Sequence, residues 1–240
     1  TRWFRKEEPD RYESVANEVE SLLHEEAEEG QPEDLGEVDT FRFEEARLMK
    51  AALKALAEEA WAPALAWSEG RSEQQSFWAR RSPSRRMAWR LIARMARLGQ
   101  ALAASWSGLE ARRKALGGTW HGHADALADY THEGVGWTVD TAHRALEAEV
   151  ATHWDARLPH YATLQERLRQ LRHAYRHWAD TLSWRYAELC AAHGPLPDPQ
   201  LRLRSVFRRT VRQLLDDHPQ SRVAFILLDG LRYELGANLA

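Results

Sequence analysis

The chain has 240 residues, 44% of them hydrophobic, and a net charge of -3, which allows one or two domains with a sizeable core and carries no global signal of nucleic-acid binding. No run approaches the roughly 18 apolar residues of a membrane span, and no signal-peptide pattern is visible. The single cysteine, Cys190, cannot form an internal disulfide, so we expect a cytoplasmic protein with no membrane association.

Charge is distributed unevenly along the chain. Residues 1–60 hold 8 basic and 18 acidic side chains, whereas residues 61–220 hold 23 basic and 16 acidic ones. Within the acidic part, apolar residues at helical spacing predict an amphipathic helix over residues 9–29, which begins at Pro9. A second helical pattern covers residues 41–67, and we expect Pro63 to kink or break it.

One of the two strongest periodic segments follows a polar connection and predicts a helix of about thirty residues that ends near Gly117-Gly118. Its apolar residues alternate spacings of four and three, as in the seam of a packed helix pair: Ala88, Ile92, Met95, Gly99, Leu102, Trp106 and Leu109.

An arginine stripe lies on the same helix. Arg86, Arg90, Arg94 and Arg97 are spaced so that their guanidinium groups share one face, and Arg80, Arg81 and Arg85 lie just upstream. Such a stripe can bind the phosphates of DNA or RNA. It can equally be the solvated face of a bundle helix, or pair with the acidic N-terminal helix.

Residues 120–132 contain an H-x-H-x-D string formed by His121, His123 and Asp125, with Asp129 and His132 following. Histidine and aspartate side chains can ligate zinc if a turn gathers them. The surrounding pattern is helical, however, and histidines near a helix start are commonly capping or exposed residues.

The second strong seam follows a helix predicted over residues 140–158. It alternates spacings of three and four through Tyr161, Leu164, Leu168, Leu171, Tyr175, Trp178 and Leu182, and Leu189 continues it. Two seams of similar length, joined by enough chain to turn back, predict an antiparallel helical hairpin within a bundle.

The clearest boundary is residues 192–199, because three prolines and a glycine there cannot continue a helix. We therefore divide the chain into a helical bundle or scaffold, residues 1–197, and a second domain that starts at residue 198. The latter opens with an amphipathic helix over residues 201–217, whose inward residues are predicted to be Leu203, Val206, Phe207, Val211, Leu214 and Leu215.

An apolar run, residues 223–228, is typical of a strand buried on both faces, and it ends at Asp229-Gly230. A helical pattern through Leu231, Leu235 and Leu239 follows. Open α/β sheets bind their ligands at such strand tips, which makes Asp229 the candidate site residue. The expected fold is thus mainly α, a helical bundle followed by the first helix, strand and helix of an α/β domain.

The run I-L-L-D-G-L-R-Y-E-L-G resembles the opening motif of the PglZ family, phosphatase-like proteins of the alkaline phosphatase superfamily found in bacteriophage exclusion (BREX) defence systems. The resemblance implies a metal-dependent phosphatase or phosphodiesterase in which Asp229 binds a divalent metal, with Zn²⁺ as first choice. Arg232 and Glu234 match the same motif. The family's nucleophile and remaining metal ligands are expected downstream of Ala240, so we expect a fragment that is inactive alone.

In that case the helical region is a scaffold for other proteins of the defence assembly. The alternative is a non-catalytic helical interaction module, in which the stripe from Arg86 to Arg97 contacts nucleic acid or a protein partner.

Overall fold

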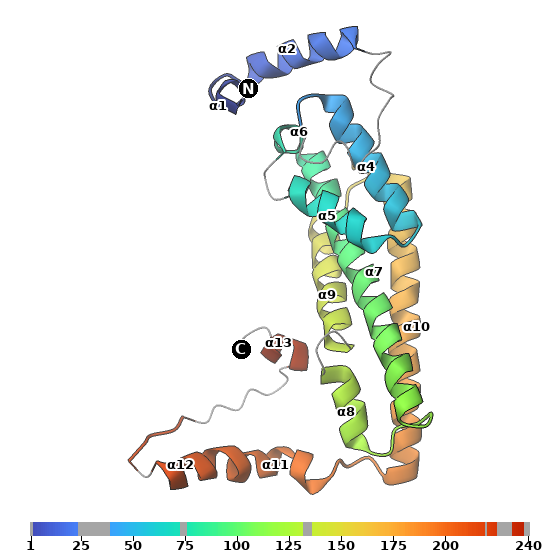
Figure 1. The fold of residues 1–240 in the computed structure, drawn as a ribbon, viewed down its shortest axis with the longest axis vertical. Helices are drawn as coiled ribbons and strands as arrows, with labels where there is room; N and C mark the ends of the chain where they lie inside the picture. Colours follow the sequence, from blue (N-terminus) through green and yellow to red (C-terminus); the bar gives the residue numbers. More distant parts are fainter. Residues whose placement is uncertain are drawn as a thin grey trace. The chain divides into compact units, whose positions relative to one another are not determined.

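Helices are the only regular elements in the residues that the computed structural model describes, which are 2–23, 39–72, 76–131, 136–218, 220–224 and 232–237 (Figure 1). None of these helices combines the length and apolar character needed to cross a membrane. The chain divides into two compact units: Thr1–Gln100 with Ala142–His173 form unit 1, and Ala101–Thr141 with Ala174–Ala240 form unit 2.

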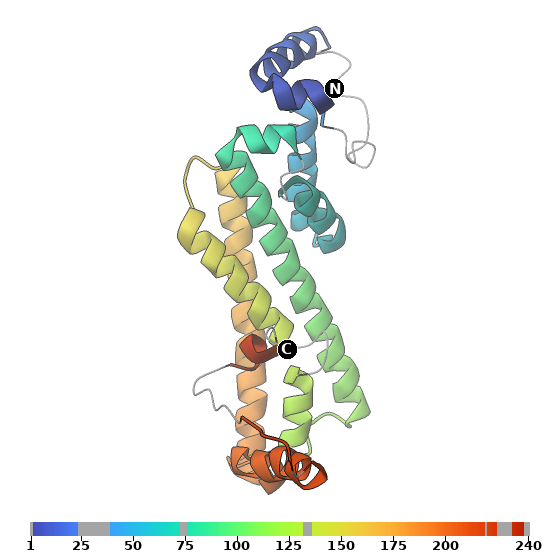
Figure 2. The ribbon, with the colours of Figure 1, turned by 90° about the vertical axis from the view of Figure 1, so that its left-hand side faces the viewer.

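The mainly helical class expected from the sequence is confirmed (Figure 2). In chain order the helices are α1 (Arg2–Glu7), α2 (Pro9–Leu22), α4 (Arg42–Ala57), α5 (Trp61–Ser72), α6 (Phe77–Arg81), α7 (Pro83–Ala115), α8 (His123–Thr131), α9 (Gly136–His153), α10 (Tyr161–His193), the short 3₁₀ turn η1 (Pro199–Leu201), α11 (Leu203–Val206), the π-helical η2 (Phe207–Arg212), α12 (Gln213–Asp217) and α13 (Tyr233–Ala237). The expected strand over residues 223–228 lies mostly outside the described residues, and the α/β domain from residue 198 stays a prediction.

The expected break near Pro63 is confirmed. It falls at residues 58–60, where Glu59 has a left-handed φ of 58°. Pro63 then occupies the first turn of α5, where its missing N–H removes no intrahelical hydrogen bond. The long helix α7 ends at Ala115, and the positive φ values of Gly117 and Gly118 explain why it stops there.

Both predicted seams lie on single continuous helices. On α7 every residue of the first seam is buried except Trp106, which is half-buried. On α10 the residues Leu164, Leu168, Leu171, Trp178 and Leu189 of the second seam are buried. The apolar spacing therefore predicted both the helices and their buried faces.

The two seams do not form an antiparallel hairpin. In unit 2 the indole N–H of Trp178 on α10 donates to the hydroxyl of Ser105 on α7 at 2.9 Å, and Leu109 lies near Leu189 on the wall of one cavity. Residue numbers thus rise together along both helices, which run in the same direction. Helix α8 runs antiparallel to α10 in this unit. Its first residue, His123, is hydrogen-bonded to Gly194 just after the end of α10. Near the other end of α8, Tyr130 shares the hydrogen-bond acceptor Asp140 with Tyr175, which lies earlier on α10. The spacing of a seam predicts which face of a helix is buried but not the direction in which the helix runs. Helices α8 and α9 lie between α7 and α10 in the chain, so the chain can return before α10 begins.

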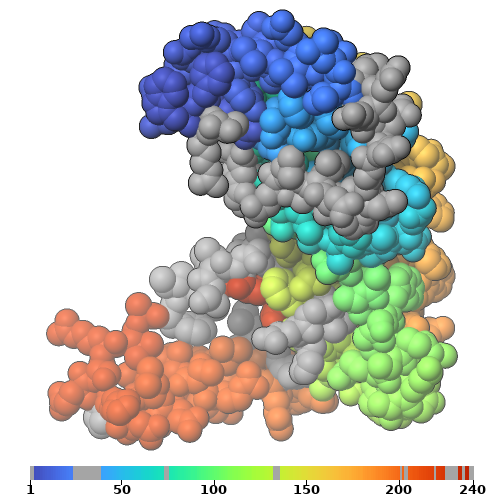
Figure 3. All heavy atoms as spheres, turned by 45° about the horizontal axis from the view of Figure 1, so that its top comes forward, coloured from blue at the N-terminus to red at the C-terminus, as the bar shows by residue number. Residues whose placement is uncertain are grey.

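An aromatic cluster holds the N-terminal helices to α6 within unit 1. Tyr12, Ala16, Phe77 and Trp78 are buried together, and Phe4 and Phe41 pack against them. The rings of Tyr12 and Phe77 meet edge to face with centroids 4.9 Å apart. Figure 3 shows the atoms of α2 lying against those of α4, in agreement with the contacts between these helices.

The helical run α11, η2 and α12 departs from its predicted amphipathic burial. Of the six residues expected to face inward, Val211 is buried, whereas Phe207 and Leu214 are 47% and 46% exposed. The periodicity correctly predicted the helix, but among the described residues no neighbouring element covers most of its apolar face.

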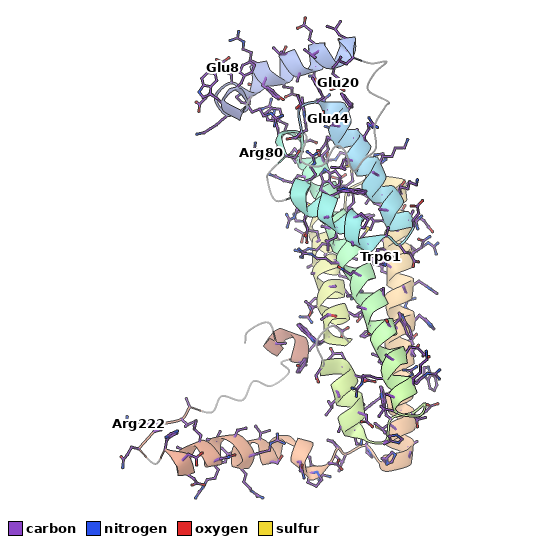
Figure 4. All side chains as sticks on the ribbon, in the orientation of Figure 1. Glu8, Glu20, Glu44, Trp61, Arg80 and Arg222 are labelled. Atoms are coloured by element: carbon purple, nitrogen blue, oxygen red, sulfur yellow. The ribbon has the colours of Figure 1, made fainter. Side chains whose placement is uncertain are left out.

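Gly99→Ala is expected to lower the free energy of unfolding by about 1–2 kcal/mol, because extra volume in a packed contact is destabilising. An ideal Cβ at Gly99, in the middle of α7, would overlap the indole ring of Trp61, the first residue of α5 (Figure 4). In an unobstructed helix the same exchange gains about 1 kcal/mol.

Gly70→Ala on α5 is the matched control, because a Cβ there has no atom within 4 Å. Chemical denaturation of both variants compares them directly. Equal stabilities would contradict the close approach of Trp61 to Gly99.

Candidate functional site

The motif around Asp229 is only partly described. Asp229 itself lies outside the described residues, as does the side chain of Glu234. Arg232 is exposed, and its carbonyl oxygen accepts a hydrogen bond from the N–H of Gly236 at 3.1 Å as α13 begins. A helix therefore starts four residues after Asp229, in keeping with the helical pattern predicted from Leu231 onward.

Tyr233, the tyrosine of the motif, ties α13 to helices α8 and α9 of unit 2. Its hydroxyl donates to the carbonyl oxygen of Thr131 at 3.2 Å. Its ring meets the rings of Tyr130 and Trp137 edge to face, with centroids 6.1 and 6.4 Å apart. The motif helix is thus held by aromatic contacts that sequence reasoning did not predict, since the partners lie about a hundred residues away.

Three of the four arginines of the stripe form ion pairs within unit 1. Arg90 and Arg94 approach the same carboxylate oxygen of Glu149 on α9, at 3.1 and 3.9 Å. Arg97 pairs with Glu69 on α5. These contacts match the interhelical alternative for the stripe, although the carboxylates come from α5 and α9 rather than from the N-terminal helix. Nucleic-acid contact by the stripe stays a prediction.

Glu149 is the centre of this arrangement. It is buried, and its second carboxylate oxygen lies 3.1 Å from Nδ1 of His153, one turn further along α9. Because a buried carboxylate is costly without a counter-charge, the two guanidinium groups stabilise it in place. The arginines therefore serve the packing of α7 against α9.

The H-x-H-x-D string has structural roles in unit 2. The carboxylate of Asp125 accepts the backbone N–H of His121 at 2.8 Å at the start of α8. His123 is buried, and its Nε2 lies 3.0 Å from the carbonyl oxygen of Gly194. Asp129, also buried, pairs with Arg112 and accepts the indole N–H of Trp120 at 2.7 Å.

These contacts give Asp125, His123 and Asp129 different partners, so the three side chains do not share one site. Throughout the described residues, no three His, Cys, Asp or Glu side chains are grouped so that they could hold a metal ion. His132 lies outside the described residues.

A buried charge cluster in unit 1 was not anticipated from the sequence. Arg71 on α5 lies 3.2 Å from Asp39 and 3.4 Å from Glu45, and all three side chains are buried. The hydroxyl of Ser76 lies 3.1 Å from both carboxylates, and the indole N–H of Trp89 donates to Glu45 at 2.5 Å. Burial raises the pKa of Glu45, while the hydrogen bond from Trp89 and the charge of Arg71 lower it.

One sequence signal could have found part of this cluster. Glu45 stands three, four and seven residues before Leu48, Met49 and Ala52, which places it on the buried stripe of α4. A carboxylate on an apolar stripe needs a buried partner. Its partner, Arg71, has no such spacing signal.

The fold defines a mainly helical, bundle-type protein. Comparisons with protein-family models, with curated proteins and with solved structures found no match to this chain.

Proposed function

We propose that this chain is the helical scaffold and the first active-site segment of a PglZ-like, metal-dependent phosphatase or phosphodiesterase. The scaffold is residues 1–197, and the α/β phosphatase domain starts at residue 198. In this proposal Asp229 is a ligand of the divalent metal, with Zn²⁺ as first choice. The protein works in the cytoplasm together with other proteins of a BREX defence assembly.

The observation that carries the proposal is the sequence around Asp229. An apolar run of strand length ends at this aspartate, Gly230 follows it, and a helix begins at Tyr233. A carboxylate between a buried strand and a helix lies where α/β folds bind ligands. There it can hold a cation that polarises a phosphoryl group or activates the attacking nucleophile.

The ion pairs of the arginine stripe support the scaffold role for the helical region. A surface that binds nucleic acid through phosphates needs cations that are free to replace counterions. Arg90 and Arg94 instead neutralise Glu149, and Arg97 neutralises Glu69. We therefore favour the scaffold over the nucleic-acid interaction module.

One carboxylate is not a complete metal site, since catalytic zinc uses three protein ligands and an open position. The described residues contribute no group of three ligands. We propose that other residues supply the remaining ligands and the nucleophile, and we assign no catalytic step to the described residues.

Metal removal tests the proposal in the protein that carries this chain. Chelation followed by dialysis is expected to abolish hydrolysis of bis(p-nitrophenyl) phosphate, and added Zn²⁺ is expected to restore it, because the metal stabilises charge on the phosphoryl group. The 240-residue chain alone should give no turnover under the same conditions. Hydrolysis that survives complete removal of divalent metals would refute the proposal.

A further inference from the structure

A cavity of about 330 Å³ in unit 1 gathers positive charge at the start of α7. Its walls include three arginines, two serines and one carboxylate, namely Arg42, Arg81, Arg85, Ser82, Ser84 and Glu13. They come from α2, α4, α6, the turn at Ser82 and the first turn of α7. We call this cavity the arginine pocket.

The single acidic side chain on these walls is already engaged by two of the arginines. Glu13 lies 3.2 Å from Arg42 and 2.8 Å from Arg81, and Arg81 also pairs with Asp10 at 2.5 Å. The carboxylate of Glu13 therefore cannot neutralise all three guanidinium groups, and the lining residues carry a surplus of positive charge.

Arg85 carries that surplus. It is half-buried, and within the described part of the chain no carboxylate forms an ion pair with it. Burial, and then the like charge of Arg42, lower the pKa of Arg85, and these effects outweigh the attraction of the Glu45, Glu20 and Glu13 carboxylates. A half-buried guanidinium beside a second one is unfavourable unless an anion joins them.

Two serine hydroxyls, those of Ser82 and Ser84, also line the cavity and can donate hydrogen bonds. Ser82 immediately precedes α7, and its hydroxyl lies 3.2 Å from that of Ser84. A helix of 33 residues begins here, so its positive dipole end adds to the charge of the arginines. Serine hydroxyls at a helix N-terminus are suitable donors to a phosphate oxygen.

Trp78 adds a buried aromatic side chain to the wall of the cavity. It lines the cavity, its side chain is 1% exposed, and its indole nitrogen has no hydrogen-bond partner among the described residues. The guanidinium of Arg42 lies 5.6 Å from the centre of the Trp78 ring.

We propose that the arginine pocket binds the phosphate group of a small phosphorylated molecule. Guanidinium groups bind phosphate oxygens with paired, charge-assisted hydrogen bonds, and Arg85 forms no ion pair with a described carboxylate, although Glu13 lines the same cavity. A cavity of about 330 Å³ has room for a phosphate and a small organic group.

Nucleic acid fits the site less well than a small molecule does. A polynucleotide needs a track of cations, but three of the arginines that continue along α7 are held by carboxylates: Arg90 and Arg94 by Glu149, and Arg97 by Glu69. Trp78 is covered, so it offers no face for base stacking. The site is also independent of Asp229, and Asp229→Asn should leave it unchanged.

Isothermal titration calorimetry of the 240-residue chain at low salt tests the proposal with inorganic phosphate, AMP and adenosine as probes. AMP and inorganic phosphate are expected to bind, and adenosine is not. Tighter binding of AMP than of phosphate would indicate a phosphomonoester as the source, and equal binding would indicate free phosphate.

Variants locate the binding in the pocket. Arg85→Gln is expected to weaken binding of AMP at least about 10-fold, since hydrogen bonds to charged groups are the stronger ones. Glu13→Gln is expected to strengthen it, because the competing carboxylate is removed. Arg80→Gln is the control, because Arg80 is exposed on α6 and does not line the cavity (Figure 4).

Circular dichroism of each variant checks that it is folded. If Arg85→Gln proves unstable, Arg85→Lys replaces it, and this variant is expected to retain part of the affinity for AMP. Failure of the wild-type chain to bind either phosphate or AMP would overturn the proposal. Equal affinities of wild type and a folded Arg85→Gln variant for AMP would also overturn it. Binding of a DNA oligonucleotide without a terminal phosphate, if inorganic phosphate does not displace it, would overturn it as well.

Discussion

Replacing Arg71 by methionine is expected to lower the free energy of unfolding by about 3–5 kcal/mol at neutral pH, because it removes one partner of a buried ion cluster. The Arg71 guanidinium lies between the carboxylates of Asp39 and Glu45, 3.2 and 3.4 Å away. The three side chains are only 5%, 6% and 1% exposed, so water cannot replace the lost charge.

The carboxylates themselves are held by donors that the substitution leaves in place. The backbone N–H of Phe77 donates to Asp39 at 2.5 Å, and the indole of Trp89 donates to Glu45 at 2.5 Å. Arg5 remains 3.7 Å from Asp39, but Glu45 would lose its neighbouring cation, and the repulsion between the two buried carboxylates adds to the cost of burial.

The loss of unfolding free energy in Arg71→Met should depend on pH. Burial already raises the folded-state pKa of Glu45 above its ordinary value of 4.5, and loss of the Arg71 charge raises it further. A carboxyl with a raised folded-state pKa contributes its full stability below its unfolded pKa and loses that contribution as the pH rises through the folded one. The difference between variant and wild type should therefore shrink as the pH falls from neutral toward 4.5.

Urea unfolding followed by circular dichroism at both pH values measures this difference. Arg157→Met is the control, because Arg157 pairs with Asp155 on the exposed surface, where ion pairs contribute little. An Arg71→Met protein as stable as the control at neutral pH would show that the cluster does not depend on its cation.

Asp229→Asn, in the protein that carries this chain, is expected to reduce metal-dependent hydrolysis of a phosphodiester reporter at least about 100-fold, on the proposal that Asp229 binds the metal. Changes to groups that merely support metal ligands cost about 10–100-fold in activity or affinity, so loss of a direct ligand should cost at least as much. Asparagine keeps the shape of the side chain and removes its charge, so the fold should be unaffected.

The control for this variant is Asp217→Asn, which alters an exposed carboxylate at the end of α12. Turnover and bound metal are measured on both proteins. Unchanged turnover in Asp229→Asn would remove Asp229 from the active site, whereas lost turnover with unchanged metal content would assign it a role other than metal ligand.

The helices could be predicted from local spacing. The seams from Ala88 to Leu109 and from Leu164 to Leu189 correspond to the buried faces of α7 and α10. Helix ends were equally local, since Gly117 and Gly194 adopt the left-handed conformations that stop these two helices. Helix α1 was missed because its six residues, three of them basic, contain no repeated apolar spacing.

The candidate site was predictable only in part. Asp229, Arg232 and Glu234 were selected from a contiguous motif, which needs no knowledge of distant contacts. The sequence did not predict the pocket around Arg85, although Arg81 and Arg85 stand next to the arginine stripe. Its charge surplus depends on Glu13, about seventy residues away, being shared by Arg42 and Arg81.

Periodicity along the chain was therefore enough to predict where helices form and which face each one buries, because both depend on residues within a few turns. The packed structure alone decided that α7 and α10 run in the same direction in unit 2, since spacing carries no information on direction. It also decided which charges form ion pairs: Arg90, Arg94 and Arg71 meet carboxylates far away in sequence, while Arg85 forms no ion pair with a carboxylate of the described residues. An ion pair requires two side chains within about 4 Å, and only tertiary packing brings such distant residues together.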